Sequence, residues 1–166
     1  MDERVTNTRD TAGVIAPPPV IALAVLLLGL ALDRLTPVGV TGAVFPRSLR
    51  FVLAGALIVA AAWAMGRALW RFRLAGTPAE PWKPTTALAR RGIYARTRNP
   101  MYQAFGLFIL GVAFAVTSDW IFLLLPPGVL LMHFGVVRRE ERYLAAKFGE
   151  DYRSYRDVVP RYGWPV

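Results

Sequence analysis

The chain has 166 residues, of which 55% are hydrophobic, and its 20 Lys and Arg residues outnumber its 11 Asp and Glu residues, giving a net charge of +9. A soluble domain of this size has too little interior to hide so many apolar side chains, so the composition favours a membrane protein. Because the sequence contains no cysteine and one histidine, disulfides and thiolate metal sites are excluded and we predict no metal site.

Four apolar stretches follow one another along the chain, each near the roughly 20 residues that cross about 30 Å of hydrocarbon. They cover residues 18–32, 49–69, 100–117 and 120–137. Residues 1–13 mix acidic and basic side chains, and we interpret them as a mobile tail without a signal-peptide cleavage site. The sequence therefore predicts an all-α integral membrane bundle with four transmembrane helices.

Only Ser118 and Asp119 separate the third apolar stretch from the fourth. A connection this short requires the two helices to form a tight antiparallel hairpin. Either residue can cap the fourth helix, and Trp120 can lie at the level of the lipid headgroups.

The connection between the second and third stretches, residues 71–99, is too long for a simple turn, and three prolines keep its first half extended. It ends at Asn99 and Pro100, a pattern typical of an N-cap followed by proline at the first helical position. Free backbone N–H groups and the helix dipole favour an anion at such a helix start. With Arg98 beside it, this helix start is a candidate anion-binding site.

The fourth stretch carries acidic groups at its end. His133, Val137 and Glu140 recur at spacings of four and three residues, so they would share one face of an α-helix, with Glu141 about a third of a turn further round. Gly149 is a natural helix stop. The tyrosine-rich segment that follows indicates a folded helical cap.

Most Lys and Arg residues lie in the two tails and in the second connection, and the connection at Ser118 and Asp119 holds none. With four spans these basic segments share one side of the membrane, which the positive-inside rule assigns to the cytoplasm. We therefore expect cytoplasmic N- and C-termini and a cytosolic cap. Nucleic-acid binding is not expected, because the arginines follow the membrane topology.

Several short motifs occur in one order in the second half of the chain. They are Arg91-Gly92-Ile93-Tyr94, Arg98-Asn99-Pro100-Met101-Tyr102, His133, Glu140-Glu141, Phe148-Gly149, Tyr152, Tyr155 and Val159-Pro160-Arg161. Together they resemble the isoprenylcysteine carboxyl methyltransferase family in its short bacterial form, and the related phospholipid N-methyltransferases resemble the same region. The resemblance covers roughly residues 77–164. Asn99 stands where the eukaryotic carboxyl methyltransferases carry histidine, and Ala104 stands where glycine is frequent.

The resemblance implies an integral membrane methyltransferase of the bacterial inner membrane that uses S-adenosylmethionine, in a pocket on the cytosolic side. Residues 14–70 would supply the first two helices, and residues 71–166 would form the methyltransferase core with its loop, hairpin and cap. Carried over by position, the cofactor-binding residues would be Tyr94, Arg98, Asn99, Pro100, Tyr102, His133, Glu140 and Glu141. Tyr152 and Tyr155 would help to close the pocket.

The residue types also fit the chemistry of this cofactor. Arg98 and the helix start at Pro100 suit the α-carboxylate of S-adenosylmethionine, and Glu140 or Glu141 suits its ammonium group or its ribose. Methyl transfer is an in-line displacement, so positioning should supply much of the acceleration. If the acceptor must lose a proton, His133 is the first candidate base and a glutamate the second. His133, Arg98 and Glu140 are therefore the candidate catalytic residues.

Other interpretations stay open at this point. An NADPH-dependent enone or sterol reductase could use a related membrane hairpin, and a noncatalytic module could bind anionic lipid through its basic loops. Arg98 and the glutamates could form an ion pair that only fixes helix orientation, and His133 could be a packing residue. We expect a small lipophilic acceptor, with a carboxylate, thiol or amine as the methylated group. A homodimer through the first two helices is also possible.

Overall fold

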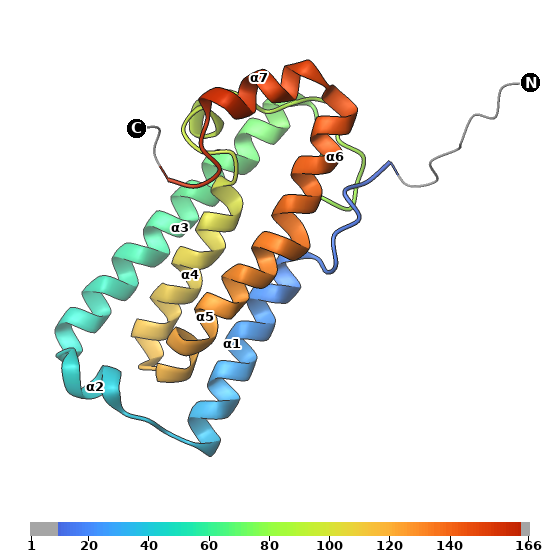
Figure 1. The fold of residues 1–166 in the computed structure, drawn as a ribbon. Helices are drawn as coiled ribbons and strands as arrows, with labels where there is room; N and C mark the ends of the chain where they lie inside the picture. Colours follow the sequence, from blue (N-terminus) through green and yellow to red (C-terminus); the bar gives the residue numbers. More distant parts are fainter. Residues whose placement is uncertain (1–9, 164–166) are drawn as a thin grey trace, which may run out of the picture.

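The computed structural model describes residues 10–163, and all regular secondary structure in this range is helical. The elements are α1 (Pro18–Leu35), α2 (Val40–Val44), α3 (Arg47–Ala75), the 3-10 helix η1 (Gly92–Ala95), α4 (Pro100–Val116), α5 (Asp119–Met132), the π-helical segment η2 (His133–Val137), α6 (Arg138–Phe148) and α7 (Glu150–Val158). The helices α1, α3, α4 and α5 run side by side, with α2 at one end of the bundle and α6 and α7 at the other (Figure 1). The predicted all-α class is confirmed.

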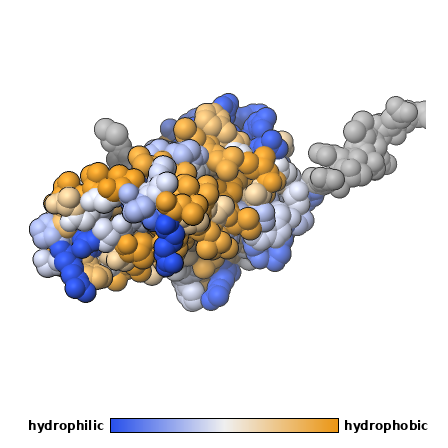
Figure 2. Space-filling model, turned by 90° about the horizontal axis from the view of Figure 1, so that it is seen from below, coloured by the Kyte–Doolittle hydropathy of each residue, from blue (hydrophilic) through white to orange (hydrophobic). Residues whose placement is uncertain are grey.

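Three helical stretches are long and apolar enough to cross a membrane: Pro18–Leu35, Arg47–Ala75 and the continuous run Asp119–Phe148. The helix Pro100–Val116 is also apolar but shorter, with 17 residues. Many large apolar side chains of these helices are exposed. Figure 2, which views the molecule from the α2 end, shows wide apolar areas on the surface. An apolar exterior of this extent suits contact with lipid hydrocarbon.

The helix starts follow from local sequence signals. Proline occupies the first turn of both α1 and α4, where its missing N–H costs nothing, so the predicted helix start at Pro100 is confirmed. The helix α3 continues to Ala75 and ends at Gly76, which has a φ of 65°. Arg71 and Arg73 therefore lie on the last turns of a helix, and the connection to α4 begins at Gly76 and not at residue 71 as predicted.

The hairpin between α4 and α5 is built around Ser118. Its hydroxyl accepts a hydrogen bond from the backbone N–H of Ile121 at 3.0 Å, as predicted for an N-cap, and it also bonds to the carboxylate of Asp33 on α1. The neighbouring Asp119 has another role, because its carboxylate accepts the backbone N–H of Thr41 at 2.8 Å. These bonds hold α1 and α2 against the hairpin.

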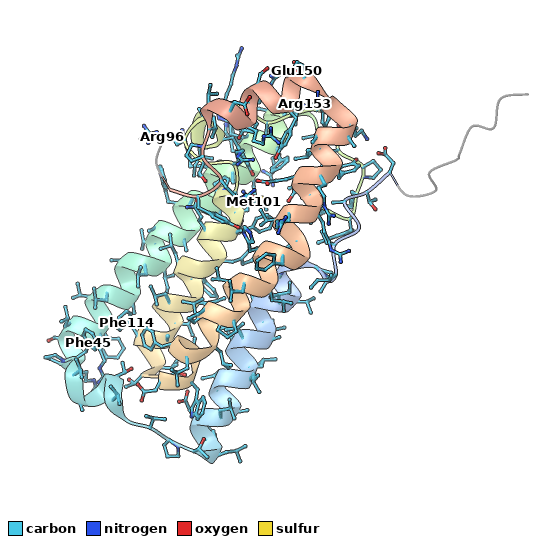
Figure 3. The ribbon with its side chains drawn as sticks, in the orientation of Figure 1. Phe45, Arg96, Met101, Phe114, Glu150 and Arg153 are labelled. Carbon is cyan, nitrogen blue, oxygen red and sulfur yellow. The ribbon has the colours of Figure 1, made fainter. Side chains whose placement is uncertain are left out.

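The same end of the bundle is closed by aromatic packing. Phe45, which follows α2, lies edge to face against Phe114 of α4, with ring centroids 5.4 Å apart (Figure 3). Phe114 in turn packs against Phe122 of α5 at 4.9 Å. Edge-to-face pairs of this kind stabilise beyond the burial of their area.

Glycines allow two pairs of helices to approach closely. A Cβ added at Gly111 of α4 would lie 2.8 Å from Cγ1 of Ile58 and 3.2 Å from the carbonyl oxygen of Ala54, both on α3. A Cβ added at Gly29 of α1 would lie 2.5 Å from Cγ1 of Ile121 on α5. Small residues at such contacts are the usual means by which membrane helices pack.

We expect the substitution Gly111→Val to destabilise the fold by about 1–3 kcal/mol, because the added methyl groups would separate α3 from α4. Gly55→Val on α3 is the matched control, since nothing lies within 4 Å of a Cβ at that position. Both changes place a β-branched residue inside a helix. Thermal unfolding in detergent measures the difference, and equal melting temperatures of the two variants would contradict this packing.

The segment before α1 contacts α6. The carboxylate of Asp10 lies 2.6 Å from Nζ of Lys147, and Nη1 of Arg139 donates to the carbonyl oxygen of Gly13 at 3.0 Å. Residues 1–9 of the predicted mobile tail lie outside the described residues. The ends of the described chain therefore lie near the α6 and α7 end of the bundle (Figure 1).

Candidate functional site

Three charged side chains meet where the start of α4, the start of α6 and the segment after α7 come together. Nη1 of Arg98 lies 2.8 Å from Oε1 of Glu141. Arg161 binds the same carboxylate with two parallel contacts, Nε to Oε1 at 2.9 Å and Nη2 to Oε2 at 2.7 Å. The side chains of Arg98 and Glu141 are only 10% and 13% exposed. The structure thus joins clusters that are about forty residues apart in the sequence.

The charges of this group do not cancel. Two guanidinium groups, those of Arg98 and Arg161, share the one carboxylate of Glu141, so the group carries a net positive charge. The Nε of Arg98 is also buried and has no hydrogen-bond partner among the described residues. Because buried donors are normally paired, this unpaired N–H and the net charge favour an anionic ligand.

The neighbouring Glu140 is in a different environment. Its Oε2 accepts a hydrogen bond from the hydroxyl of Tyr102 on α4 at 2.6 Å. Within residues 10–163 no cation lies in ion-pair contact with Glu140, whereas Glu141 has two. A buried carboxylate held only by a neutral phenol lacks a compensating positive charge, which a cationic ligand group would supply.

Three buried tyrosines surround this charged group. Tyr94 packs edge to face against Phe72 of α3 at 5.3 Å, and its carbonyl oxygen accepts the hydroxyl of Tyr155 at 2.7 Å. Nη1 of Arg98 lies 3.4 Å from the hydroxyl of Tyr152. Burial, and secondarily the charge of Glu141, raise the pKa of Tyr152 to about 12. Burial likewise raises the pKa values of Tyr94 and Tyr155, so all three remain neutral phenols.

These raised pKa values predict that the fold loses stability between about pH 10 and pH 12, because the unfolded tyrosines ionise near pH 10 while the folded ones stay protonated. The stabilisation from Tyr152 is complete below pH 10, and about 2 kcal/mol of it is lost by pH 12. Denaturant unfolding at several pH values measures this loss. The variant Tyr152→Phe should show a shallower decline, and identical pH profiles of variant and wild type would contradict the shift.

Arg98 and Glu141 of the charged group line one cavity together with the tyrosines, and this cavity has about 580 Å³ of atom-free space that includes its opening to solvent. Arg161 is not among the described residues that line it. The expected residues that line it are Tyr94, Arg98, Asn99, Glu140, Glu141, Tyr152 and Tyr155. Phe72 of α3 and the loop from Pro78 to Ala89 complete the wall.

Three of the expected site residues lie elsewhere. Pro100 is fully buried and lines a different cavity, between α3 and α4. Tyr102 reaches the group only through its bond to Glu140. His133 is not among the described residues that line the polar cavity; its Nδ1 lies 3.0 Å from the hydroxyl of Tyr162.

The position of His133 has a clear physical origin. Residues 133–137 form a π-helical turn, which departs from the 3.6-residue period that would put His133 and Glu140 on one face. Asn99 also differs from expectation. It stands at the N-cap position of α4, but its side chain does not cap the helix, and its Nδ2 donates to the carbonyl oxygen of Arg161 at 3.1 Å.

Sequence reasoning missed the role of Arg161, although this residue belongs to one of the motifs that carry the family resemblance. One signal could have found it: the predicted site contained two carboxylates, those of Glu140 and Glu141, but only one arginine, Arg98, to pair with them. It also missed the loop from Pro78 to Ala89 as a wall of the cavity. The length and proline content of this loop indicated a function without specifying a contact.

A second, apolar cavity lies next to the polar one, between α1, α4 and α5. It has about 760 Å³ of atom-free space including its opening, and its lining includes Ile21, Val25, Phe105, Leu125 and Met132. Tyr102 and Tyr162 also line it. Because the hydroxyl of Tyr102 bonds to Glu140, this tyrosine lies between the apolar cavity and the charged group.

A helical bundle with an apolar exterior is the arrangement of an integral membrane protein, and this one carries a charged cavity at one end. Residues 49–151 match the phospholipid methyltransferase family, and the chain belongs to this family. The matched range contains Arg98, Glu140 and Glu141, whereas Arg161 lies beyond it.

The chain is also similar to the protein-S-isoprenylcysteine O-methyltransferase of Schizosaccharomyces pombe, with 36% identity over 74 residues. The match covers 44% of this chain and 31% of the yeast protein, so the chain matches less than a third of the length of that relative. No solved structure matches the chain. The family resemblance carried by the sequence motifs is confirmed.

Proposed function

We propose that the protein is an S-adenosylmethionine-dependent methyltransferase that acts on a lipophilic acceptor in the membrane. The observation that carries the proposal is the separation of charge in the polar cavity. A net positive group of Arg98, Glu141 and Arg161 lies beside Glu140, which has no cationic partner among the described residues. The methyl donor carries an α-carboxylate and an α-ammonium group, and these opposite charges require such a pair of sites.

The residues of the cavity fit the cofactor. The buried, unpaired Nε of Arg98 would donate to the carboxylate, with the guanidinium of Arg161 beside it. Glu140 would accept from the ammonium group, and the neutral tyrosines would donate to uncharged oxygens. We assign the carboxylate to the guanidinium of Arg98, which lines the polar cavity, and not to the helix start, because Pro100 lines another cavity. S-adenosylmethionine bound here supplies an electrophilic methyl group on its sulfonium.

The residues of this chain then position the reactants and exclude water. Displacement at a methyl carbon requires an in-line approach, which a fixed binding geometry makes far more frequent. Tyr102 and Glu140 lie where the apolar cavity adjoins the charged group, so a proton released by a thiol or ammonium acceptor could pass to Glu140. His133 contacts Tyr162, which lines the apolar cavity, and it remains a second candidate base.

The neighbouring apolar cavity indicates the chemical class of the methyl acceptor. This cavity would hold the hydrocarbon part of a lipid or small lipophilic molecule, with the carboxylate, thiol or amine to be methylated near Tyr102. The names of the family and of the yeast relative refer to a phospholipid and to an isoprenylated cysteine, both of which carry long apolar chains. Neither a reductase nor a noncatalytic module is favoured by these relatives.

We extend the proposal to four membrane spans, formed by α1, α3, α4 and α5 with η2. At 1.5 Å per residue, the 17 residues of α4 reach about 26 Å, so the bilayer would have to thin slightly around it. The end that carries α6 and α7 would face the cytoplasm of a bacterial inner membrane, because most Lys and Arg residues lie there.

Methyl transfer can be tested directly. Isotope-labelled methyl donor is incubated with the purified protein and a lipid extract, and the labelled product is identified by mass spectrometry. We expect label in a lipid or lipophilic product, and much less label with Glu140→Gln in place of the wild type. Label that stays in the aqueous phase with every extract fraction would contradict a lipophilic acceptor.

A further inference from the structure

A second polar cleft lies outside the candidate site, where the end of α3 meets the segment before η1. Its lining consists of Arg71, Leu74, Ala75, Leu88, Ala89, Arg90 and Arg91, and it has about 960 Å³ of atom-free space including its opening. Three of these side chains are guanidinium groups and none is acidic. Leu88 and Ala89 also line the polar cavity of the candidate site, so the two cavities share a wall.

The backbone fixes one of the three arginines in place. Gly92 has a φ of 66°, and a Cβ added there would lie 2.8 Å from Cζ of Arg71. The absence of a side chain at this position lets the guanidinium of Arg71 lie against the backbone. The Nε of Arg71 is buried and has no hydrogen-bond partner among the described residues. A buried donor without a partner is unusual and indicates a missing acceptor.

The positive charge of the cleft is poorly balanced by the protein. Arg90 forms a long contact with Asp151 at 3.6 Å, and the side chain of Asp151 is 71% exposed. Exposed pairs of this kind contribute little. For Arg71 and Arg91, no carboxylate lies within ion-pair distance in the part of the chain that the structure describes. Three guanidinium groups on one cleft therefore repel each other unless an anion joins them.

The position of the cleft indicates which anion. The cleft lies at the last turns of a long apolar helix, next to the exposed side chains of Trp70 and Leu74. Tryptophan prefers the headgroup level of a membrane, and planar guanidinium groups bind phosphate oxygens with paired hydrogen bonds. We propose that this cleft binds a phosphate-bearing anion, either the headgroup of an anionic phospholipid or a free phosphate compound. This site is separate from the proposed methyl-transfer site and does not depend on it.

The test uses the full chain purified in neutral detergent. Phosphatidylglycerol and inorganic pyrophosphate are titrated separately, and binding is followed by native mass spectrometry. The double variant that carries both Arg71→Gln and Arg91→Gln should bind the phosphate-bearing ligand about tenfold more weakly, because two charge-assisted contacts are lost. The variant Arg73→Gln with Arg156→Gln removes the same charge from exposed positions outside the cleft and should bind as the wild type does.

A third variant, Ala75→Glu, keeps every arginine but adds a carboxylate to the cleft, so it should also weaken binding. It serves as an independent test if the double substitution impairs folding. Loss of phosphatidylglycerol binding alone assigns the site to a lipid headgroup, and parallel loss of pyrophosphate binding assigns it to phosphate in general. Equal affinities in the two double variants, or no binding of either ligand to the wild type, would overturn the proposal.

Discussion

Replacement of Arg98 by glutamine is expected to weaken binding of S-adenosylhomocysteine by about tenfold or more, because a charge-assisted contact to the ligand carboxylate is lost. The substitution also makes the group at Glu141 neutral, since Arg161 alone then balances its carboxylate. The remaining pair is bidentate, so the variant should stay folded. Isothermal titration of the detergent-purified protein measures the affinity.

The matched control is Arg153→Gln. Arg153 lies on α7 and forms an exposed contact with Glu150 at 3.4 Å (Figure 3). The variant Arg153→Gln loses the same charge from the same end of the molecule but from a position outside the cavity. It should therefore bind S-adenosylhomocysteine as tightly as the wild type. Equal weakening in both variants would show that only the overall charge matters, and would remove Arg98 from the site.

Neutral substitutions of the two adjacent glutamates should have different consequences. In Glu140→Gln the amide oxygen can still accept from Tyr102, so stability should be nearly unchanged while ligand affinity falls about tenfold or more, because the partner of the ammonium group is lost. In Glu141→Gln two guanidinium groups lose their shared carboxylate, and stability should fall by about 2 kcal/mol. This cost is reduced because Arg161 is 37% exposed.

Paired measurements of melting temperature and affinity separate these two outcomes. Glu150→Gln, at an exposed position on α7, is the control and should change neither quantity. If Glu140→Gln lowers the melting temperature as strongly as Glu141→Gln and leaves affinity intact, then Glu140 is a packing residue. The ammonium site would then have to lie elsewhere.

Much of the fold could be predicted because its signals are local. Each of the four apolar stretches became a helix whose start lies close to the expected one. Pro18 and Pro100 occupy first turns, and Gly149, with a φ of 54°, ends α6 as expected. Ser118 caps α5 through a local contact as well, because its hydroxyl accepts from a backbone N–H only three residues away. Family motifs then indicated which segments would meet.

The parts that sequence reasoning missed depend on tertiary contacts. The π-helical turn at residues 133–137 adds an extra residue to one turn, which no periodic pattern reveals, and it separates His133 from Glu140. Arg161 reaches Glu141 only because the segment after α7 lies against the residues before α4, where the backbone N–H of Arg98 donates to the carbonyl oxygen of Pro160 at 3.0 Å. Asn99 has a capping side chain by type, but its side-chain oxygen caps no N–H of α4, and its Nδ2 instead donates to the carbonyl oxygen of Arg161 in the segment after α7.

The central claim is that the polar cavity binds the methyl donor, and calorimetric titration with S-adenosylhomocysteine tests it most directly. NADPH is titrated in parallel against the same detergent-purified protein. The account predicts saturable binding of S-adenosylhomocysteine at one site, with a rise in melting temperature, and no response to NADPH. Binding of NADPH alone would contradict it, as would S-adenosylhomocysteine binding that survives the loss of both Arg98 and Glu140.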